Sequence, residues 1–438
     1  MTETRTPATG TLAEPTANPW QWIPSLYFGQ GIPYAVVMTL SVLMYKRLDI
    51  SNTDIALYTS WLYLPWVIKP LWSPFVDMFR TKRFWIVTLQ LVIGAALALV
   101  ALTLPLDHAF QITLAVFWLM AFSSATHDIA ADGFYMLGLQ EHQQAAFVGV
   151  RSTFYRIAMI AVQGGLVYLA GWFEQTTGSV TFAWSVVFFV LAGMFAALSL
   201  YHRAVLPYPA TDSLRTSTEK PLREFLRVFA LFLGKKHILP ILAFLLLYRF
   251  GEAQLLKLAA PFLLDAPAKG GLGLTTQQVG IVYGTAGVVC LTLGGILGGL
   301  AISRFGLKRL LWPMALSLNV PHLVYVALAY GLPTNIYVIG FAVALEQLGY
   351  GFGFAAYLLY MILISDGPHK TAHYALCTGF MALGMMLPGM LSGYLQSWLG
   401  YPHFFVWICI AAAPALVATA AVYGQIPPGF GAKRDTAS

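Results

Sequence analysis

The sequence has few charged residues and very few cysteines for its length. Of its 438 residues only 10% are charged, whereas a soluble globular protein carries about 25%. This composition excludes a soluble enzyme. The three cysteines, Cys290, Cys377 and Cys409, all lie in apolar runs and none belongs to a Cys-x-x-Cys pair. We therefore expect neither a disulfide framework nor a cysteine metal site.

Several sequence motifs of catalysis and conduction are also missing. The chain has no Gly-Lys-Ser/Thr phosphate loop for ATP. It has no paired metal ligands, no nucleophile with a matching base, and no symmetrically repeated filter of the kind that ion channels use. The net charge of +7 is not carried by a polar basic domain, so it does not indicate a nucleic-acid partner. We expect no enzymatic activity, no cofactor and no bound metal.

Long apolar runs make up most of the chain instead, and 58% of the residues are hydrophobic. A helix that crosses a bilayer needs about 20 mainly apolar residues. The runs predict an all-α integral membrane protein of twelve transmembrane helices in two sets of six. They fall at about 22–46, 54–76, 84–105, 109–139, 145–172, 179–202, 238–264, 275–302, 308–330, 335–363, 371–397 and 402–424.

A polar stretch with several prolines divides the two sets of helices. It opens with Pro207-Tyr208-Pro209, which cannot continue a helix. Further on, Leu226 and Phe229 continue an apolar pattern of helical spacing beside basic residues, which indicates either a helix in the membrane surface or a solvated linker helix. The predicted order is a disordered cytoplasmic tail (1–19), a six-helix bundle (20–203), a cytoplasmic linker (204–236), a second bundle (237–426) and a cytoplasmic tail (427–438).

The basic residues of the loops predict the orientation in the membrane. Of the 25 Lys and Arg residues, five lie inside the predicted helices and 20 lie in loops or tails. With twelve spans both ends of the chain lie on the same side of the membrane, and 17 of these 20 residues fall on that side. Only Lys46, Arg47 and Lys269 fall on the other side. Lys and Arg are retained in cytoplasmic loops, so we expect both termini in the cytoplasm.

The two bundles form an internal repeat. Residues 76–84 read VDMFRTKRF and residues 302–310 read ISRFGLKRL, at an offset of 226 residues and between equivalent helices of the two sets. His142 and His369, each at the start of the fifth helix of its set, correspond at an offset of 227. Parallel six-helix repeats related by an axis along the membrane normal are typical of one large transporter fold.

Both basic loops resemble the short turn between helices 2 and 3 of the major facilitator superfamily. Four segments are similar to the branch that contains AmpG-type muropeptide permeases and acetyl-CoA transporters. The pattern departs from that branch at His127, where the family usually has Gln, and at Phe134-Tyr135, where it usually has Tyr-Arg. The similar segments are 27–34 (YFGQGIPY), 64–69 (LPWVIK) with Trp72, Pro74 and Asp77, 127–133 (HDIAADG) and 154–157 (FYRI).

This resemblance implies a monomeric secondary transporter in the bacterial inner membrane. It would import a small polar solute with protons by alternating access, and the solute implied is an anhydro-muropeptide or a related amino-sugar disaccharide. Another oligosaccharide, a metal–siderophore chelate and an acyl-CoA-type anion remain alternatives. A membrane sensor that transports nothing is the alternative from a different functional class.

Nine charged residues inside the predicted helices are the candidates for function, because a charge at a helix centre costs about 2.5–3.5 kcal/mol on insertion scales. Five are bases and four are acids, and the excess of bases favours an acidic ligand. They are Lys69, Asp128, Asp132, Arg151, Arg156, Arg249, Glu252, Lys257 and Glu346.

Asp128 and Asp132 lie four residues apart and therefore share one helix face. Two neighbouring carboxylates in a low-dielectric site can load and release a proton, which makes them the first candidates for proton coupling. The alternative is that each is permanently paired with Lys69 or with an arginine of the fifth helix. Glu252 and Glu346 are further proton-coupling candidates, Glu346 being protonated or paired with a base of the other half.

The basic residues suggest two roles. Arg151 and Arg156 differ by about 140° around their helix, so only one can face a central site. Arg156, deeper in the helix, is the candidate for binding a carboxylate or phosphate, and Arg151 is the candidate for a gate or for snorkelling. Arg249 is expected to pair with Glu252, three residues on, or to exchange partners between states. Lys257 is a further substrate-binding candidate.

The first two helices contribute the remaining substrate-binding candidates. Gln30 and Tyr34 surround a Gly-Ile-Pro segment that predicts a break in the first helix. Lys69 lies between two prolines, in a helix expected to kink around a cavity. Asn319 and His322 of the ninth helix are interpreted as helix-packing hydrogen bonders.

The basic loops predict a conformational latch. Asp77 is expected to cap the helix that begins near residue 370, across the two halves, with Arg80 and Arg83 beside it. In the second copy Ser303 replaces the acid, with Arg309 as the matching base, which predicts a weaker latch there.

Overall fold

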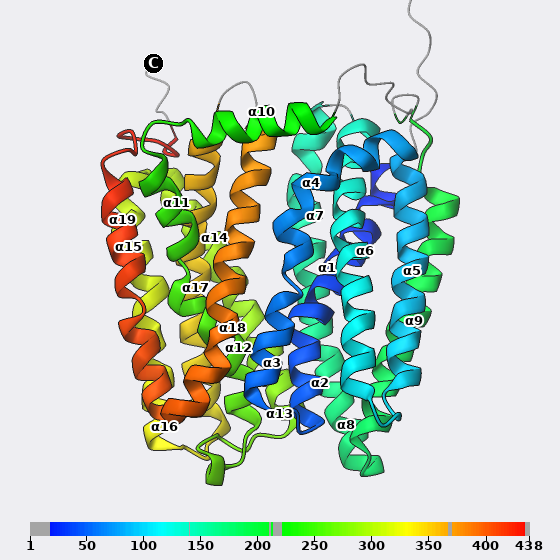
Figure 1. The fold of residues 1–438 in the computed structure, drawn as a ribbon, viewed down its shortest axis with the longest axis vertical. Coiled ribbons are helices and arrows are strands. Elements are labelled where there is room, and N and C mark those ends of the chain that lie inside the picture. The colour runs from blue at the N-terminus through cyan, green and yellow to red at the C-terminus, as the bar shows by residue number, and fades with distance from the viewer. Residues whose placement is uncertain (1–17, 140, 210–211, 213–220, 367–369, 434–438) are drawn as a thin grey trace, which may run out of the picture.

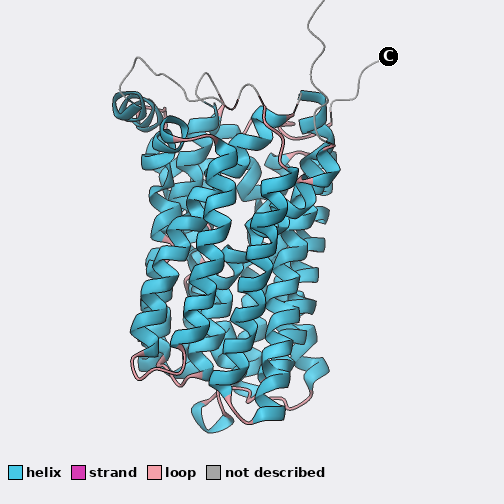
Figure 2. Cartoon of the chain, turned by 90° about the vertical axis from the view of Figure 1, so that its right-hand side faces the viewer, coloured by secondary structure: helices cyan, strands magenta, loops and turns pink. Residues whose placement is uncertain are grey.

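The computed structural model describes residues 18–139, 141–209, 212, 221–366 and 370–433, and in this part of the chain the backbone forms helices and connecting loops without a strand (Figure 2). Helices suit a bilayer because they satisfy their backbone groups internally. The N-terminal half contains η1 (Pro19–Gln21), α1 (Ile23–Ala35), η2 (Val36–Leu40), α2 (Ser41–Arg47), α3 (Asn52–Trp61), α4 (Leu64–Phe79), α5 (Lys82–Thr103), α6 (Ala109–Gly138), α7 (Glu141–Ile160), η3 (Ala161–Leu166), α8 (Val167–Thr177) and α9 (Val180–Val205).

The C-terminal half follows the linker helix α10 (Pro221–Leu233). Its longest helix, α18, contains a non-helical residue, Gly400, which separates two spans. The helices of this half are α11 (Ile238–Leu247), α12 (Phe250–Leu264), η4 (Pro267–Lys269), α13 (Thr276–Val279), η5 (Gly280–Gly287), α14 (Val288–Phe305), α15 (Leu307–Asn319), η6 (Val320–His322), α16 (Leu323–Gly331), α17 (Ile336–Ser365), α18 (Lys370–Ile410) and α19 (Ala413–Tyr423).

These helices form twelve membrane spans within the described residues, as the hydrophobic runs predict. Ten stretches are long and apolar enough to cross a bilayer. One of them, Ala372–Tyr423, holds two spans joined at Gly400, and α3 with α4 forms the remaining span. Spans 1 to 6 are α1–α2, α3–α4, α5, α6, α7–α8 and α9. Spans 7 to 12 are α11–α12, α13–α14, α15–α16, α17, residues 370–399 and residues 401–423.

The two six-span halves stand side by side (Figure 1). The linker helix α10 lies across one end of the bundle, perpendicular to the spans (Figures 1 and 2). We call this face the linker end. Residues 430–433 also lie there, because the backbone N–H groups of Leu307 and Lys433 bond to the carbonyls of Phe430 and Ser303, respectively.

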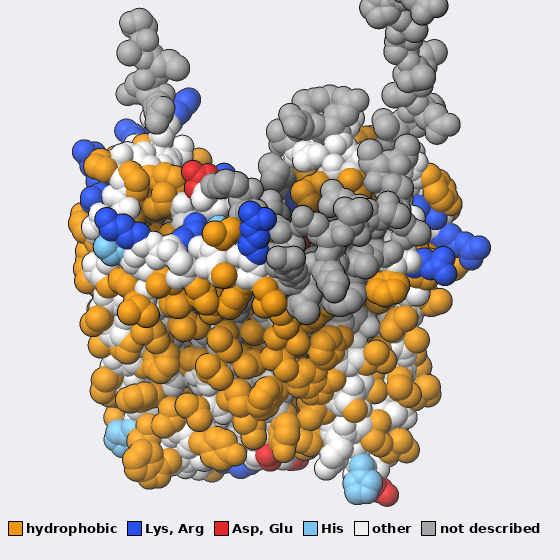
Figure 3. Space-filling view, turned by 45° about the horizontal axis from the view of Figure 1, so that its top comes forward, with side chains coloured by type: hydrophobic (Ala, Val, Ile, Leu, Met, Phe, Trp, Pro, Cys, Tyr) orange, Lys and Arg blue, Asp and Glu red, His pale blue; other side chains and the backbone are white. Residues whose placement is uncertain are grey.

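The surface of the bundle has two zones. In Figure 3 a broad wall of hydrophobic side chains covers the spans, and Lys and Arg gather around the linker end. The linker helix α10 has a mixed environment. Its Phe232 is fully buried and stacks on Phe380 of span 11, whereas Leu226 and Leu231 are about half exposed. A surface position for α10 stays a prediction.

The first span differs from the predicted break. Instead of stopping near Gln30, α1 continues through Pro33 into the π-helical stretch η2. The N–H of Val36 still bonds to the carbonyls of Ile32 and Pro33, so the backbone is not left open. Gly31 serves close packing, since a Cβ there would lie 2.9 Å from the carbonyl oxygen of Tyr155 in α7.

Candidate functional site

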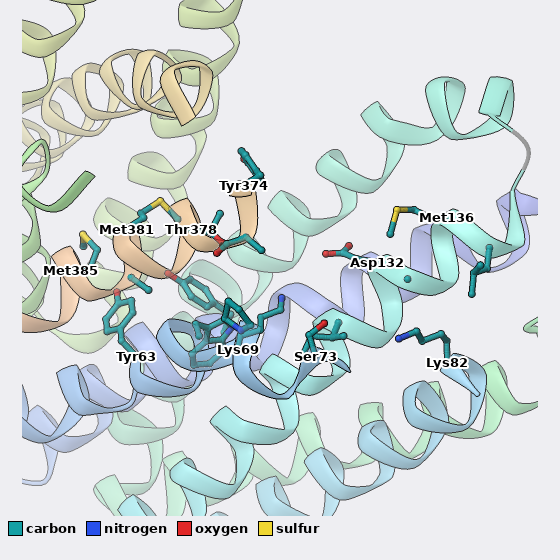
Figure 4. Close-up of a pocket in the computed structure, with 18 of the residues that line it drawn as sticks. Tyr63, Lys69, Ser73, Lys82, Asp132, Met136, Tyr374, Thr378, Met381 and Met385 are labelled. Atoms are coloured by element: carbon teal, nitrogen blue, oxygen red, sulfur yellow. The ribbon is translucent and has the colours of Figure 1, made fainter. Parts of the chain in front are cut away.

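A cavity of about 1000 Å³ lies between the two halves. Its lining comes from spans 1, 2 and 4 on one side and from spans 7 and 11 on the other. Arg80, Lys82 and Asp212 line it near the linker end, so the cavity extends from the middle of the bundle toward that face. In Figure 4, Met381 and Met385 of α18 face Tyr63 and Lys69 of the N-terminal half.

One wall of the cavity is aromatic. Tyr34, Tyr63 and Trp66 all line it. The rings of Tyr34 and Trp66 meet edge to face, with centroids 5.4 Å apart and planes at 90°. Met381 and Met385 supply an adaptable apolar surface opposite. This combination suits a ligand with flat or apolar faces.

Interrupted helices bring two of the lining residues to the cavity. Pro65 lacks an N–H and its ring conflicts with the carbonyl four residues earlier, so α3 ends at Trp61 and α4 begins at Leu64. Tyr63 lies in the resulting bend. Arg249 has non-helical backbone angles (φ −111°, ψ 23°) between α11 and α12, which turns its side chain out of the regular helix pattern.

The carboxylate of Asp128 is held by neighbours from span 2. The Nζ atom of Lys69 lies 3.7 Å from Asp128 Oδ2, and the indole N–H of Trp66 donates to the same oxygen at 3.1 Å. The pairing alternative for Asp128 is therefore the arrangement in this structure. Lys69 also lines the cavity, so a ligand that binds Lys69 would weaken its hold on Asp128.

Asp132 forms a second ion pair on this face, again as in the pairing alternative. Arg151 donates to Asp132 Oδ1 at 2.8 Å, and the Tyr27 hydroxyl donates to the same oxygen at 3.3 Å. The guanidinium of Arg151 also lies over the rings of Tyr27 and Tyr135, at 4.5 and 5.0 Å. Asp132 itself lines the cavity, whereas Arg151 does not, so of the two acids only Asp128 is connected to the cavity through its base, Lys69.

Two predicted substrate-binding residues reach across the halves rather than into the cavity lining. Lys257 donates to the Thr59 hydroxyl at 3.0 Å and lies 5.1 Å from the ring centroid of Tyr63. Arg156 donates to the Thr292 hydroxyl at 3.5 Å. Neither residue lines the cavity. Gln30 is buried and does not line the cavity either.

Arg249 and Glu252 do not form the predicted pair. Arg249 lines the cavity, bonds to the Tyr350 hydroxyl and lies 4.8 Å from the ring centroid of Phe354. Glu252 instead accepts a hydrogen bond from His322 at 3.1 Å. The pair fails because Arg249 precedes the first turn of α12, so the side-chain geometry of residues three apart in a helix does not apply.

The predicted latch residues lie at the linker end. The side chain of Asp77 and residues 367–369 lie outside the described part, so that contact is a proposal. The backbone N–H groups of Lys82 and Arg83 donate to the carboxylate of Asp212, at 2.8 and 3.1 Å. Arg80 lines the cavity. The first loop therefore binds the linker.

The second loop is bound by the tail of the chain. The hydrogen bonds from Leu307 to Phe430 and from Lys433 to Ser303 both measure 2.8 Å. The side chains of Ser303 and Arg309 are exposed. Their predicted part in a latch stays a prediction.

At the end opposite the linker, the two halves are in direct contact. Lys46 of span 1 forms a 2.7 Å ion pair with Asp265, which follows span 7. Asn52 of span 2 donates to Gln396 and Tyr401 of the C-terminal half, at 2.9 and 2.8 Å. The π-helical stretches η3 and η5 are also packed closely against each other. A Cβ on Gly284 of η5 would lie 1.8 Å from the backbone oxygen of Gln163 in η3. The cavity is thus closed at this end.

The sequence did not single out several residues that this geometry brings to the site. Tyr63, Met381 and Met385 line the cavity, yet in sequence they look like ordinary core residues. His322 forms a hydrogen bond between helices, as predicted, but its partner, the buried Glu252, was not predicted. The one available signal was Pro321, which predicts an interruption of span 9 beside His322.

Comparisons with known proteins agree with this architecture. A protein of Haemophilus influenzae (strain Rd) is 27% identical over 88% of this chain and 90% of its own length. The anhydromuropeptide permease of Escherichia coli K12 is 25% identical over 90% of this chain and 77% of its own. A variant of the nucleoside transporter NupG superposes with a TM-score of 0.69 at 16% identity, covering 94% of this chain and all of the other.

An inward-facing bacterial homolog of the lysosomal transporter Spinster gives the same TM-score at 15% identity, covering 95% of this chain and 99% of the other. The sequence profile described as the Major Facilitator Superfamily matches residues 25–373. Two six-span halves, as in this structure, are typical of that superfamily. The chain is a multi-pass membrane protein that belongs to the Major Facilitator Superfamily of transporters.

Proposed function

We propose that this transporter imports an acidic amino-sugar or muropeptide ligand together with protons across the bacterial inner membrane. The observation that carries this proposal is the cavity itself. Four bases, Lys69, Arg80, Lys82 and Arg249, line it with two acids, Asp132 and Asp212, together with the aromatic wall and three methionines. Bases suit a carboxylate, and aromatic rings suit the faces of sugar rings. The similarity to an anhydromuropeptide permease supports the same ligand class.

The orientation proposed places the linker end in the cytoplasm. Lys and Arg gather around that end (Figure 3), which is the side on which basic loop residues are retained. With both termini there, the cavity is open toward the cytoplasm and closed toward the periplasm. The contacts of Lys46 and Gly284 then belong to an inward-facing state, and import requires these contacts to separate.

Proton coupling is proposed to involve the acids of span 4. Lys69 contacts both the cavity and Asp128. A ligand carboxylate that attracts Lys69 would leave Asp128 without its base, and a buried carboxylate without a partner is costly unless it takes up a proton. Binding of the anion and of the proton would then favour each other. Asp132 lines the cavity itself, and its base Arg151 does not.

Uptake into proteoliposomes tests the proposal. The vesicles carry an imposed inward proton gradient, and the panel contains an anhydro-muropeptide, a neutral disaccharide and a siderophore chelate. We expect concentrative uptake of the anhydro-muropeptide alone, abolished by a protonophore. In Asp128→Asn we expect exchange of ligand to persist while accumulation is lost. Uptake that is unchanged by both the protonophore and this substitution would refute the proposed proton coupling. Uptake of a different ligand from the panel would refute the proposed ligand class.

A further inference from the structure

A second charged cluster lies inside the C-terminal half, outside the cavity lining. Glu252 of span 7, His322 of span 9 and Glu346 of span 10 are each 0% exposed. Each offers one oxygen or nitrogen atom, and these three atoms lie within 4.8 Å of one another. They come from three helices that the sequence separates by up to 94 residues, so the fold has assembled them.

The cluster has unused bonding capacity. His322 Nε2 and Glu252 Oε2 are 3.1 Å apart, and Gln347 donates to Glu346 Oε2 at 2.9 Å. The other oxygens of both glutamates, and Nδ1 of His322, are buried without a hydrogen-bond partner. The hydroxyl of Tyr325 is also buried and unpartnered, and it lies within electrostatic range of both carboxylates. Buried polar atoms are rarely left without partners.

The cluster also has more acids than bases. Among the described residues, His322 is the one basic group within 4.0 Å of either carboxylate. The guanidinium of Arg249 is turned toward Tyr350 and Phe354. Two buried carboxylates are costly as ions unless a positive charge accompanies them or a proton neutralises them, so a cation and a proton would compete for this cluster.

We propose that Glu252, His322 and Glu346 bind a transition-metal dication of the zinc class. Two carboxylate oxygens and one imidazole nitrogen are ligands that such ions take, and the nitrogen disfavours sodium, calcium and magnesium. A triangle with sides no longer than 4.8 Å has a point within about 2.8 Å of all three corners, compared with metal–ligand distances of about 2.0–2.2 Å. Each ligand therefore has to move by less than about 1 Å.

The position of the cluster indicates how an ion would enter and what its binding would do. Arg249 lines the cavity and precedes Glu252 by three residues in the chain, so the cluster lies near this part of the cavity wall. We expect the ion to enter from the cavity past the side chain of Arg249. A bound ion would tie span 7 to spans 9 and 10. Occupancy would therefore stiffen the C-terminal half and restrict the movement of Arg249.

Zinc binding to the purified, chelator-stripped full-length protein tests this inference without any transport substrate. We expect one Zn²⁺ per chain in competition with a zinc indicator, and a rise in the unfolding midpoint of about 3 °C at saturating zinc. In Glu346→Gln and in His322→Gln we expect the affinity to fall at least tenfold. His403→Gln, which removes an exposed histidine of span 12, is the matched control and should bind as the unaltered protein does.

X-ray absorption at the zinc edge of the unaltered protein keeps the inference testable if a cluster variant fails to fold. We expect one imidazole with oxygen ligands at about 2.0–2.2 Å and no sulfur. Three results would each overturn the inference. The protein could bind less than one Zn²⁺ per chain at about 100 μM zinc in the indicator competition, both cluster variants could bind zinc as the unaltered protein does, or the spectrum could lack an imidazole ligand. Because no substrate is present, this failure is distinct from a failure of proton-coupled import.

Discussion

The ion pair between Lys46 and Asp265 gives the most quantitative prediction. Its Nζ and Oδ1 atoms are 2.7 Å apart, and the two side chains are only 13% and 6% exposed. Asp265 also accepts hydrogen bonds from Tyr401 at 2.7 Å and from Asn52 at 3.4 Å. Tyr401 belongs to the same half as Asp265, so only the contacts to Lys46 and Asn52 are lost when the halves separate at this end.

The energy of these contacts sets the size of the effect. A hydrogen bond to a charged group contributes about 1.5–3 kcal/mol, and we take about 2 kcal/mol for the pair. Asp265→Asn preserves the side-chain volume and removes the charge. It should therefore shift the equilibrium about 30-fold toward the state that is open at this end. A state populated at about 1% would rise to about 20–25%.

Spin-label distances between Thr177→Cys and Tyr337→Cys measure this population, in a background without Cys290, Cys377 and Cys409. Both labelled residues are exposed and lie at the closed end, one in each half. We expect a longer distance to gain weight in Asp265→Asn. Asp107→Asn, which alters an exposed acid within one half, should leave the distribution unchanged. An unchanged distribution in Asp265→Asn would refute the assignment of this pair to the closure.

Three further predictions follow from the geometry. Gly284→Ala places a Cβ against the Gln163 backbone, so it should destabilise the closed end by about 1–3 kcal/mol and favour the open state. Gly299→Ala, with open space around it, should not. The same spin-label distance checks both variants. Arg249→Gln should weaken ligand binding about 10- to 100-fold, measured by calorimetry, because a charged hydrogen bond is lost. Arg151→Gln should lower stability by no more than about 1 kcal/mol in thermal unfolding, because its pair with an acid is about one-third exposed.

Hydrophobic runs and proline positions made most of the fold predictable. Twelve spans follow from the apolar lengths, and the repeat of the basic loops predicted two equivalent halves. A proline in the sequence did not by itself predict whether a helix is interrupted. In span 1 the helix continues past Pro33 into a π-helical stretch, whereas in span 2 helix α3 ends before Pro65. Which of these occurs depends on packing partners such as Tyr155, and these are set by the tertiary structure.

Part of the charged lining of the cavity was also predictable, whereas of its aromatic and apolar lining only Tyr34 was. A charge within a span stands out in sequence, which is how Lys69, Asp132 and Arg249 were recognised before they were found to line the cavity. Met381 lines the same cavity but resembles any other core residue in its helix. The partner of Glu252 could not be predicted either, because it depends on how spans 7 and 9 are placed.

The central claim is that binding of an acidic ligand and binding of a proton favour each other in one transport cycle. The direct measurement is proton movement in weakly buffered proteoliposomes when an anhydro-muropeptide gradient is imposed without a membrane potential. The account predicts that the external medium becomes alkaline as ligand enters, and that Asp128→Asn abolishes this change. Ligand entry without any change in external pH would contradict it.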